Sequence, residues 1–492
     1  MRTLAALFAV SAALMSSTAL ADVNQMRSTA LSWLVLQQKG DGSFPAPAGL
    51  EIQATAAAAE AMRAGGLSAS PSYARAISWL ANQSAVSTDS RARQGAALAN
   101  AGRDVSALAA RLVSERDGTA VYQGTNYSGF AIWGPYANFG NSTVDTILAL
   151  GLLREAGYAY SASGNEFAQT VECWVLPNRL SASPWTNSWT HAPAQTNQPS
   201  GAATGSTLAT ALVVYEVKQS LLSGRFTVGY CGANNATVET AMANAKTWLI
   251  AQANGDGGFA QRRADTGALE ASNPVLTALS VRALSLYAST GDSAASAAVT
   301  KAQNWLDTIQ QANGSWADDP FITARVLAAL PVASGAQATD TDLDGLTDVV
   351  ETELGTNVNV ADAQSVLATN AQATSGLTAS AFSVNASLGE PFAYTLGASG
   401  GTGPYNFAIA GGALPPGLTL AANGQISGTP SSTGRYAFDY RITDGNGDQA
   451  LVIGRVDVTQ ALAADDGDVP LPAWALALLG GAMLTAMRKQ RG

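Results

Sequence analysis

The spacing of apolar residues changes once along the chain, near residue 372. From about residue 25 to 331, apolar residues recur at helical spacing, and Gly-rich turns interrupt them. From about 372 to 460, apolar and polar residues alternate between closely spaced turns, which predicts strands with one buried face. The pattern therefore predicts a multidomain chain in which an all-α part precedes a small all-β part.

A Trp-containing segment recurs within the helical part. The segment ALSWLVLQQKGDGSF at 30–44 returns as AKTWLIAQANGDGGF at 245–259 and as AQNWLDTIQQANGSW at 302–316. In each copy an aromatic residue follows the first Trp by eleven positions. A Gly-rich turn ends the Trp-containing helix, and a second helix of small residues follows, with a Thr-Ala doublet or a close variant. The repeated unit is therefore predicted to be a helical hairpin.

Helix pairs of this kind divide the helical part into about six units. They span residues 25–65, 71–103, 104–157, 165–222, 237–290 and 294–331. One helical hairpin cannot bury its apolar face alone, so neighbouring hairpins must stack. The short linkers favour antiparallel helices within the stack.

The turn that ends the Trp-containing helix also carries a recognisable motif. The pattern Q-x-x-x-G-x-[FW], which runs from Gln310 to Trp316, resembles the QW repeat of the squalene–hopene cyclase and prenyltransferase superfamily. Six paired repeats resemble the α/α toroid of that superfamily, with an inner and an outer ring of helices. The resemblance implies a toroid domain over residues 22–331. It implies little about function, because one fold hosts many functions.

The chemistry of that superfamily is not preserved in the sequence. The resemblance implies that a cyclase would protonate an alkene with a D-x-D-D-T-A motif, in which packed carboxylates keep one acid protonated. Here the third unit keeps only Asp145, and Val144 stands at the proton-donor position. The prenyltransferase zinc ligands are absent as well, since the single His191 has no suitable Asp and Cys around it. A non-catalytic protein is therefore favoured, and no catalytic residue is assigned.

Two long inserts, 121–140 and 183–197, are rich in aromatic residues. Polar and aromatic loops at the mouth of a toroid are suited to hold a glycan or an isoprenoid-like ligand. The alternative is that these aromatic residues pack against the end of the barrel as a lid or as core. The candidates for ligand contact are Tyr127, Trp133, Tyr136, Trp185 and Trp189.

An acidic loop, DTDLDGLTDVVE at 340–351, lies within a linker at 332–371. It matches D-x-D-x-D-G-x₅-E, the spacing with which an EF-hand-like loop surrounds Ca²⁺ with oxygen atoms. With the residues that follow it, the loop resembles thrombospondin type 3 calcium repeats. Ca²⁺ is the expected cofactor, and the alternative is a solvated acidic linker. The expected ligands are Asp340, Asp342, Asp344, the Leu346 carbonyl, Asp348 and Glu351.

The all-β part at 372–460 reads as a β-sandwich, since short alternating strands and frequent turns are typical of that fold. Two motifs within it, LPPGL at 414–418 and GQISGTP at 424–430, resemble the Ig-like domains repeated in bacterial surface proteins. The resemblance implies a spacer or an adhesive unit. No catalytic constellation is visible in this part.

Net charge, the N-terminal segment and the cysteines indicate the expected cellular compartment and exclude one class of partner. The net charge is −10 and basic residues cluster only at the C-terminal end, which argues against a nucleic-acid partner. Residues 1–21 have the three-part pattern of a signal peptide with an A-x-A cleavage site. In an exported chain Cys173 and Cys231 are expected to form a disulfide, and the alternative is two separate buried thiols.

The last segment, 461–492, predicts an anchor. Residues 469–487 are uncharged, and Arg488, Lys489 and Arg491 follow, which fits a short membrane span with a cytoplasmic basic end. With the motif VPLPA at 469–473, the segment resembles the C-terminal sorting signals of Gram-negative bacteria that exosortase-type enzymes read. The alternative is a permanent tail anchor in the inner membrane.

The leading functional hypothesis is an exported, surface-anchored, non-catalytic toroid that binds a ligand or partner. One alternative is an exported enzyme that resembles a terpenoid cyclase or acts on a glycan. A further alternative is a structural surface stalk.

Overall fold

The computed structural model describes residues 23–116, 121–122, 125–126, 132–137, 139–157, 169–191, 204–222, 235–359, 377, 379 and 382–460. The predicted signal peptide at 1–21 and the predicted anchor at 461–492 lie outside these ranges. Within the described part of the chain, no helix is long and apolar enough to cross a membrane.

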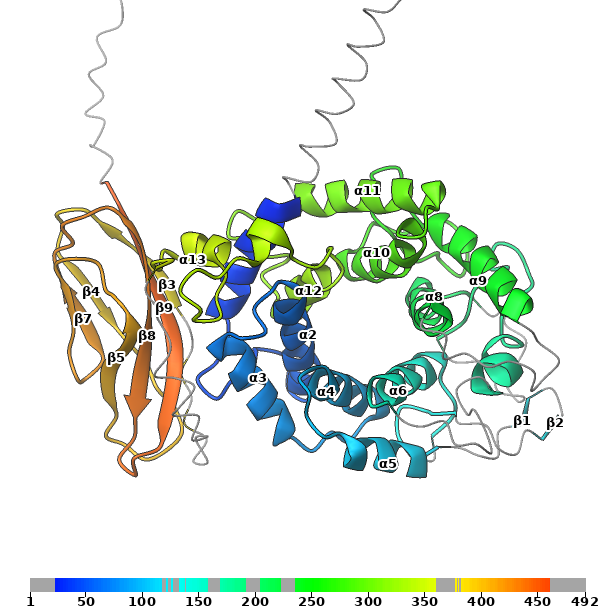
Figure 1. Ribbon diagram of the computed structural model, residues 1–492, viewed down its shortest axis with the longest axis horizontal. Helices are drawn as coiled ribbons and strands as arrows, with labels where there is room; N and C mark the ends of the chain where they lie inside the picture. Colours follow the sequence, from blue (N-terminus) through cyan, green and yellow to red (C-terminus); the bar gives the residue numbers. More distant parts are fainter. Residues whose placement is uncertain are drawn as a thin grey trace, which may run out of the picture.

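Two concentric rings of helices form the N-terminal part (Figure 1). Each ring helix pairs with its neighbour in sequence, outer then inner, so the predicted toroid of about six hairpins is confirmed. The outer ring contains the helix at 23–36, α3 (Pro71–Ala81), α5 (Ser106–Ser114), the π-helical turn η1 (Val171–Val175), α9 (Asn235–Ile250) and α11 (Ser293–Thr308). The inner ring contains α2 (Glu51–Ala64), α4 (Thr88–Asn100), α6 (Thr143–Glu155), α8 (Thr207–Leu222), α10 (Pro274–Ala288) and α12 (Pro320–Leu327).

One hydrogen bond recurs between the turn and the inner helix of five units. The backbone N–H of the turn aromatic donates to the Oγ1 of a Thr in the first turns of the inner helix, which fixes the aromatic ring in the core. The repeated motif is therefore scaffold. The pairs are Phe44–Thr55 (3.1 Å), Trp133–Thr146 (3.0 Å), Trp189–Thr210 (3.1 Å), Phe259–Thr277 (2.8 Å) and Trp316–Thr323 (3.0 Å).

In three units a turn glycine contacts the outer helix of the next unit. Gly42, Gly257 and Gly314 have φ values of 95°, 98° and 92°, which side-chain-bearing residues rarely adopt. Each also lies directly against the backbone of the following outer helix. A Cβ on these glycines would lie 2.5 Å from the carbonyl oxygen of Arg75, 2.6 Å from that of Lys301 and 2.4 Å from that of Thr29, respectively.

The contact between Gly314 and Thr29 closes the ring, because it joins the last unit to the first. Two side-chain hydrogen bonds reinforce this closure. Gln310 Nε2 donates to the Met26 carbonyl at 2.9 Å, and Arg27 Nη2 donates to the Pro331 carbonyl at 2.6 Å.

A β-sandwich forms the C-terminal part, as predicted. Aromatic and β-branched residues from both sheets, including Phe407, Ile426 and Tyr440, fill its core. Strand β3 pairs in parallel with β9, and the remaining strand pairs are antiparallel. One sheet has the order β3 (Phe382–Ser387), β9 (Gln449–Thr459), β8 (Gly434–Thr443), β5 (Asn406–Gly412), and the other has the order β4 (Phe392–Thr395), β7 (Gln425–Gly428), β6 (Leu418–Leu420).

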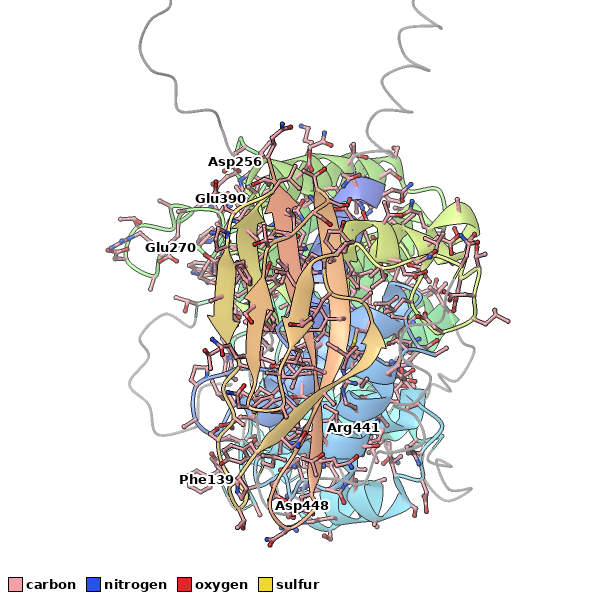
Figure 2. All side chains as sticks on the ribbon, turned by 90° about the vertical axis from the view of Figure 1, so that its left-hand side faces the viewer. Phe139, Asp256, Glu270, Glu390, Arg441 and Asp448 are labelled. Carbon is pink, nitrogen blue, oxygen red and sulfur yellow. The ribbon has the colours of Figure 1, made fainter. Side chains whose placement is uncertain are left out.

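The acidic loop and α13 (Asp348–Leu354) lie between the toroid and the sandwich. Figure 2 shows the sandwich in front of the helices of the toroid. Leu346 and Leu354 belong to the same buried cluster as Ala437 and Ile453 of the sandwich. Arg435 Nη1 donates to Glu353 Oε2 at 2.9 Å. The toroid and the sandwich therefore share one buried apolar cluster, and the acidic loop lies at their junction.

Candidate functional site

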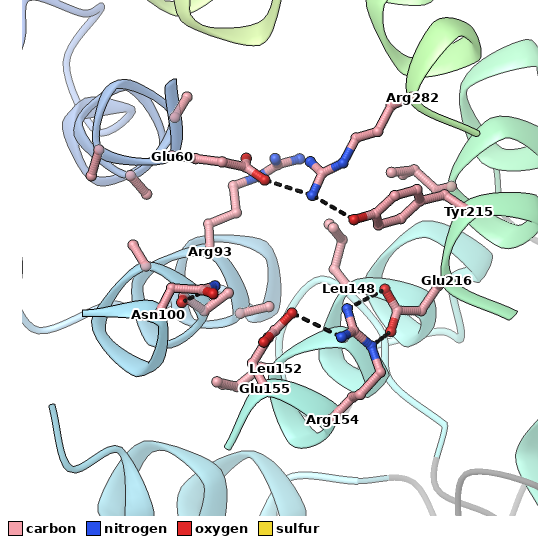
Figure 3. Close-up of a pocket in the computed structure, with 18 of the residues that line it drawn as sticks. Glu60, Arg93, Asn100, Leu148, Leu152, Arg154, Glu155, Tyr215, Glu216 and Arg282 are labelled. Carbon is pink, nitrogen blue, oxygen red and sulfur yellow. Dashed lines mark hydrogen bonds and ion pairs between the residues drawn. The ribbon is translucent and has the colours of Figure 1, made fainter. Parts of the chain in front are cut away.

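The inner ring of helices encloses a cavity of about 380 Å³ (Figure 3). Small residues keep this space open, because alanines of α2 and α4, such as Ala56, Ala59, Ala92 and Ala96, face it. The charged residues that line it are five arginines and three glutamates. Those of the charges that are buried require partners.

At one end of the cavity, two arginines share one carboxylate. Glu60 Oε1 lies 2.6 Å from a guanidinium nitrogen of Arg282, and Glu60 Oε2 accepts from Arg325 Nη1 at 3.1 Å. Arg282 Nη2 also donates to the Tyr215 hydroxyl at 3.0 Å, and its guanidinium lies 4.2 Å from the centre of that ring. Figure 3 shows Glu60, Arg282 and Tyr215 joined in this chain. We call Glu60, Arg282 and Arg325 the arginine end.

The charges of the arginine end set its protonation states. Burial alone would raise the pKa of the Glu60 carboxyl, but the charges of Arg282 and Arg325 outweigh it and lower the pKa to about 2. Burial, with Glu60 opposing it and neighbouring guanidinium groups adding to it, lowers the pKa of Arg325 to about 10. Glu60 is therefore an ionised partner at neutral pH and has no proton to donate.

The other end of the cavity has the opposite balance, with two carboxylates around one arginine. Arg154 Nε lies 2.5 Å from Glu216 Oε1, and Arg154 Nη1 lies 2.9 Å from Glu155 Oε1. Burial by itself lowers the pKa of Arg154, but the adjacent Glu216 reverses that effect and raises it. We call Arg154, Glu155 and Glu216 the glutamate end.

Asp145, the remaining acid of the cyclase-like motif, lies in the first turn of α6 and is buried. Burial raises the pKa of its carboxyl, and the negative charge of Asp89 raises it further, whereas the Ser142 hydroxyl opposes the shift. The backbone carbonyl of His191 accepts a hydrogen bond from Thr143 N, at the start of α6, at 2.9 Å. Neither Asp145 nor His191 lines the cavity between the inner helices.

The aromatic candidates for ligand contact lie mainly in the core. The exposed fractions are 1% for Trp133, 5% for Trp185 and 0% for Trp189. Trp133 Nε1 donates to the Leu112 carbonyl at 2.7 Å, and Trp189 Nε1 donates to the Val175 carbonyl at 2.6 Å. These burial values favour the alternative, in which the aromatic residues are structural, because a ligand cannot reach side chains packed in this way. Tyr136 is 47% exposed, and Tyr127 lies outside the described residues.

The acidic loop brings three of its predicted ligands together. One carboxylate oxygen from each of Asp340, Asp342 and Asp344 lies within 4.8 Å of the others. The buried oxygens Asp340 Oδ1 and Asp342 Oδ2 accept no hydrogen bond from any residue that the structure describes. Such orphaned, mutually repelling oxygens suit a hard cation.

The other predicted ligands follow on the same loop and on α13. The Glu351 side chain is fully buried. The carboxylate of Asp348 accepts from the backbone N and the Oγ1 of Thr341, at 2.8 Å each. Leu346, whose carbonyl is the predicted ligand, donates its backbone N–H to Asp344 Oδ1 at 2.8 Å. The residues present therefore fit a Ca²⁺ loop in which Asp348 helps to fold the loop.

Comparison with known protein families identifies the C-terminal part. Residues 373–459 match the family model described as "Putative Ig domain". The C-terminal sandwich is Ig-like. A comparison of the chain with curated proteins finds no match.

Solved structures give distant similarities to the chain. A variant of the type II terpene cyclase MstE from Scytonema, in complex with geranylgeranyl dihydroxybenzoate, is 15% identical with a TM-score of 0.42, and the match covers 64% of this chain and 97% of that chain. The apo form of that cyclase is 16% identical with a TM-score of 0.42, covering 63% and 98%. A protein from Actinoplanes is 17% identical with a TM-score of 0.40, covering 63% and 98%.

Cys173 is buried in η1, on the outer ring. Its predicted partner, Cys231, lies outside the described residues. The disulfide between them therefore stays a prediction.

Sequence reasoning did not single out the charges of the cavity, although a signal for them exists. The fifth residue after the recurrent Thr of an inner helix lines the cavity in four units. In three of these units the residue at that position is charged or polar, inside an otherwise apolar helix, and in the third unit it is a glycine. These residues are Glu60 after Thr55, Gly151 after Thr146, Tyr215 after Thr210 and Arg282 after Thr277.

Proposed function

We propose that this chain is an exported, surface-anchored protein whose toroid binds a polar ligand in its central cavity without changing that ligand chemically. The observation that carries the proposal is the cavity between the inner helices, which is lined by paired charges at both ends. Glycans are the better of the two ligand classes that the sequence suggests, since their hydroxyls can hydrogen-bond to carboxylate, guanidinium and amide groups.

An isoprenoid ligand is disfavoured by the same residues. An apolar chain in this cavity would remove water from the arginine end and the glutamate end and would offer no hydrogen bonds in return. A proton-initiated reaction would also need a protonated acid facing the cavity. Glu60 does not meet that need, because its pKa is lowered to about 2.

Ca²⁺ is proposed as the cofactor of the acidic loop, held by Asp340, Asp342, Asp344, the Leu346 carbonyl and Glu351, with Asp348 at the edge of the site. The ion would neutralise the clustered carboxylates and keep the loop folded. Because that loop lies between the toroid and the sandwich, Ca²⁺ would also stabilise the contact between these two parts. This role is structural.

Export and anchoring rest on the sequence of the two ends. The pattern of residues 1–21 supports export, and residues 469–487 with their basic tail support attachment to the inner membrane. The VPLPA motif supports later removal of the tail as the protein reaches the surface of a Gram-negative bacterium. The Ig-like sandwich would then act as a spacer between the surface and the toroid.

One observation favours a second candidate function, an exported enzyme that uses Asp145 as an acid. Asp145 is buried, and its pKa is raised, so it retains a proton to a higher pH than an ordinary carboxyl. Against this candidate, Val144 occupies the proton-donor position of the motif.

Product analysis separates the two candidates. Wild-type protein is incubated with squalene and with geranylgeranyl diphosphate, and the extracts are analysed by mass spectrometry. We expect both compounds to be recovered unchanged, because Glu60 carries no proton and Asp145 does not line the cavity. A cyclic product that disappears in Asp145→Asn would establish the enzyme and refute the non-catalytic proposal.

A further inference from the structure

We infer that the arginine end of the cavity recognises an oxyanion, a carboxylate or a phosphate, on a small hydroxylated molecule. The candidate ligands are thus an acidic sugar or a sugar phosphate. This inference rests on the proposed function, since it names the chemical class of the ligand for the same cavity.

The first step of the argument is an imbalance of charge at the arginine end. Arg282 and Arg325 both form an ion pair with the single carboxylate of Glu60. A third arginine, Arg93, lies beside Glu60 in Figure 3, and its own ion pair is with Asp89 at 2.8 Å. Two guanidinium groups that share one carboxylate retain a net positive charge, which an incoming oxyanion would neutralise.

The second step is the set of unused donors on Arg325. Its side chain is only 6% exposed, yet its one hydrogen bond to a described residue is the bond from Nη1 to Glu60. A guanidinium has five N–H donors in a planar fork that matches carboxylate and phosphate oxygens. Since Arg325 is also among the residues that line the cavity, its remaining donors are available to a ligand there.

The third step concerns the size and polarity of the rest of the ligand. At the glutamate end, Glu155 and Glu216 together outnumber Arg154, and their oxygens accept hydrogen bonds from hydroxyls. A second anionic group placed there would be repelled. The cavity therefore suits a molecule with one anionic group and several hydroxyls.

The experiment is a calorimetric titration of the full chain, at low ionic strength and pH 7, with glucuronate, glucose 6-phosphate and glucose. We expect wild type to bind glucuronate or the phosphate about tenfold or more tightly than glucose, and the relative affinity of the first two shows which oxyanion is preferred. Arg325→Met should weaken oxyanion binding about tenfold and leave glucose unaffected.

A second variant should act in the opposite direction. Glu60→Gln removes the internal carboxylate that competes for Arg282 and Arg325, so we expect it to tighten oxyanion binding several-fold. A variant that merely misfolds cannot produce a tighter complex. The matched controls are Arg263→Met and Glu270→Gln, exposed residues outside the cavity, which should leave every affinity unchanged.

The outcomes distinguish the inference from the function on which it rests. If glucose and the two oxyanions bind wild type equally, and Arg325→Met changes none of these affinities, the oxyanion inference is wrong and polar-ligand binding stands. If folded wild type binds none of the three, both are wrong.

Discussion

Replacement of Gly314 with alanine is expected to lower the free energy of unfolding of the toroid by about 3 kcal/mol or more. A left-handed backbone costs a residue with a Cβ about 1–2 kcal/mol, and Gly314 has a φ of 92°. The added methyl group would also lie 2.4 Å from the Thr29 carbonyl oxygen. Because that oxygen belongs to the first helix, the clash acts on the contact that closes the ring, and overpacking of this kind typically costs about 1–3 kcal/mol more.

Gly291 provides a matched control for this prediction. Its φ is also 92°, but a Cβ there would meet nothing within 4 Å. Gly291→Ala should therefore cost only about 1–2 kcal/mol. Urea unfolding followed by helical circular dichroism measures both variants. Equal losses would show that the approach of Gly314 to Thr29 contributes nothing to closure of the ring.

Removal of Ca²⁺ with a chelator is expected to lower the thermal midpoint of the wild-type chain. An ion present at about one hundred times its dissociation constant stabilises the folded state by roughly 2.7 kcal/mol. The loop that would hold it also contacts the toroid directly, since a Cβ at Gly345 would lie 2.4 Å from the Ala69 carbonyl oxygen. Loss of the ion should therefore reduce the stability of the junction as well as of the loop.

Two Glu→Gln variants on α13 separate the ligand from its neighbours. Glu351→Gln removes the predicted bidentate ligand and should abolish most of the response to Ca²⁺. Glu353→Gln removes the partner of Arg435, so it should lower the basal stability and keep the response. Differential scanning calorimetry with Ca²⁺ or with chelator measures both. The calcium proposal fails if wild type does not respond, or if Glu351→Gln responds as fully as wild type.

The features of the fold that the sequence reveals are those that depend on local, recurring contacts. The toroid follows from repeated Trp, Gly and aromatic positions, because five of the units make the same hydrogen bond, such as that from Trp316 N to Thr323 Oγ1. The same rule shows why Trp133 and Trp189 were misleading as ligand candidates. Each occupies the turn position that Phe44 occupies in the first unit, and the length of the surrounding inserts conceals the equivalence.

The local pattern marks positions that face the cavity, but it does not encode which of the charged residues there pair with one another. Glu60 and Arg282 meet only because the inner helices α2 and α10, which lie on either side of α12 in the ring, both contribute side chains to the cavity. The junction between the toroid and the sandwich also depends on a contact between distant parts of the sequence. Gly345 of the acidic loop contacts Ala69, which lies in a turn far earlier in the chain. The sequence predicts the acidic loop itself, because its candidate ligands lie within twelve consecutive residues.

The central claim, that the toroid cavity binds a polar ligand and returns it unchanged, is tested most directly by filling the cavity. Ala96 lines it, so Ala96→Phe should occupy the space that the ligand needs. Equilibrium dialysis of the full chain against labelled glucuronate and glucose measures binding, and mass spectrometry checks the recovered sugar. We predict saturable binding of glucuronate by wild type, recovery of the sugar intact, and a loss of affinity of about tenfold or more in a folded Ala96→Phe variant. Equal binding by the two proteins, or a chemically altered sugar, would contradict the claim.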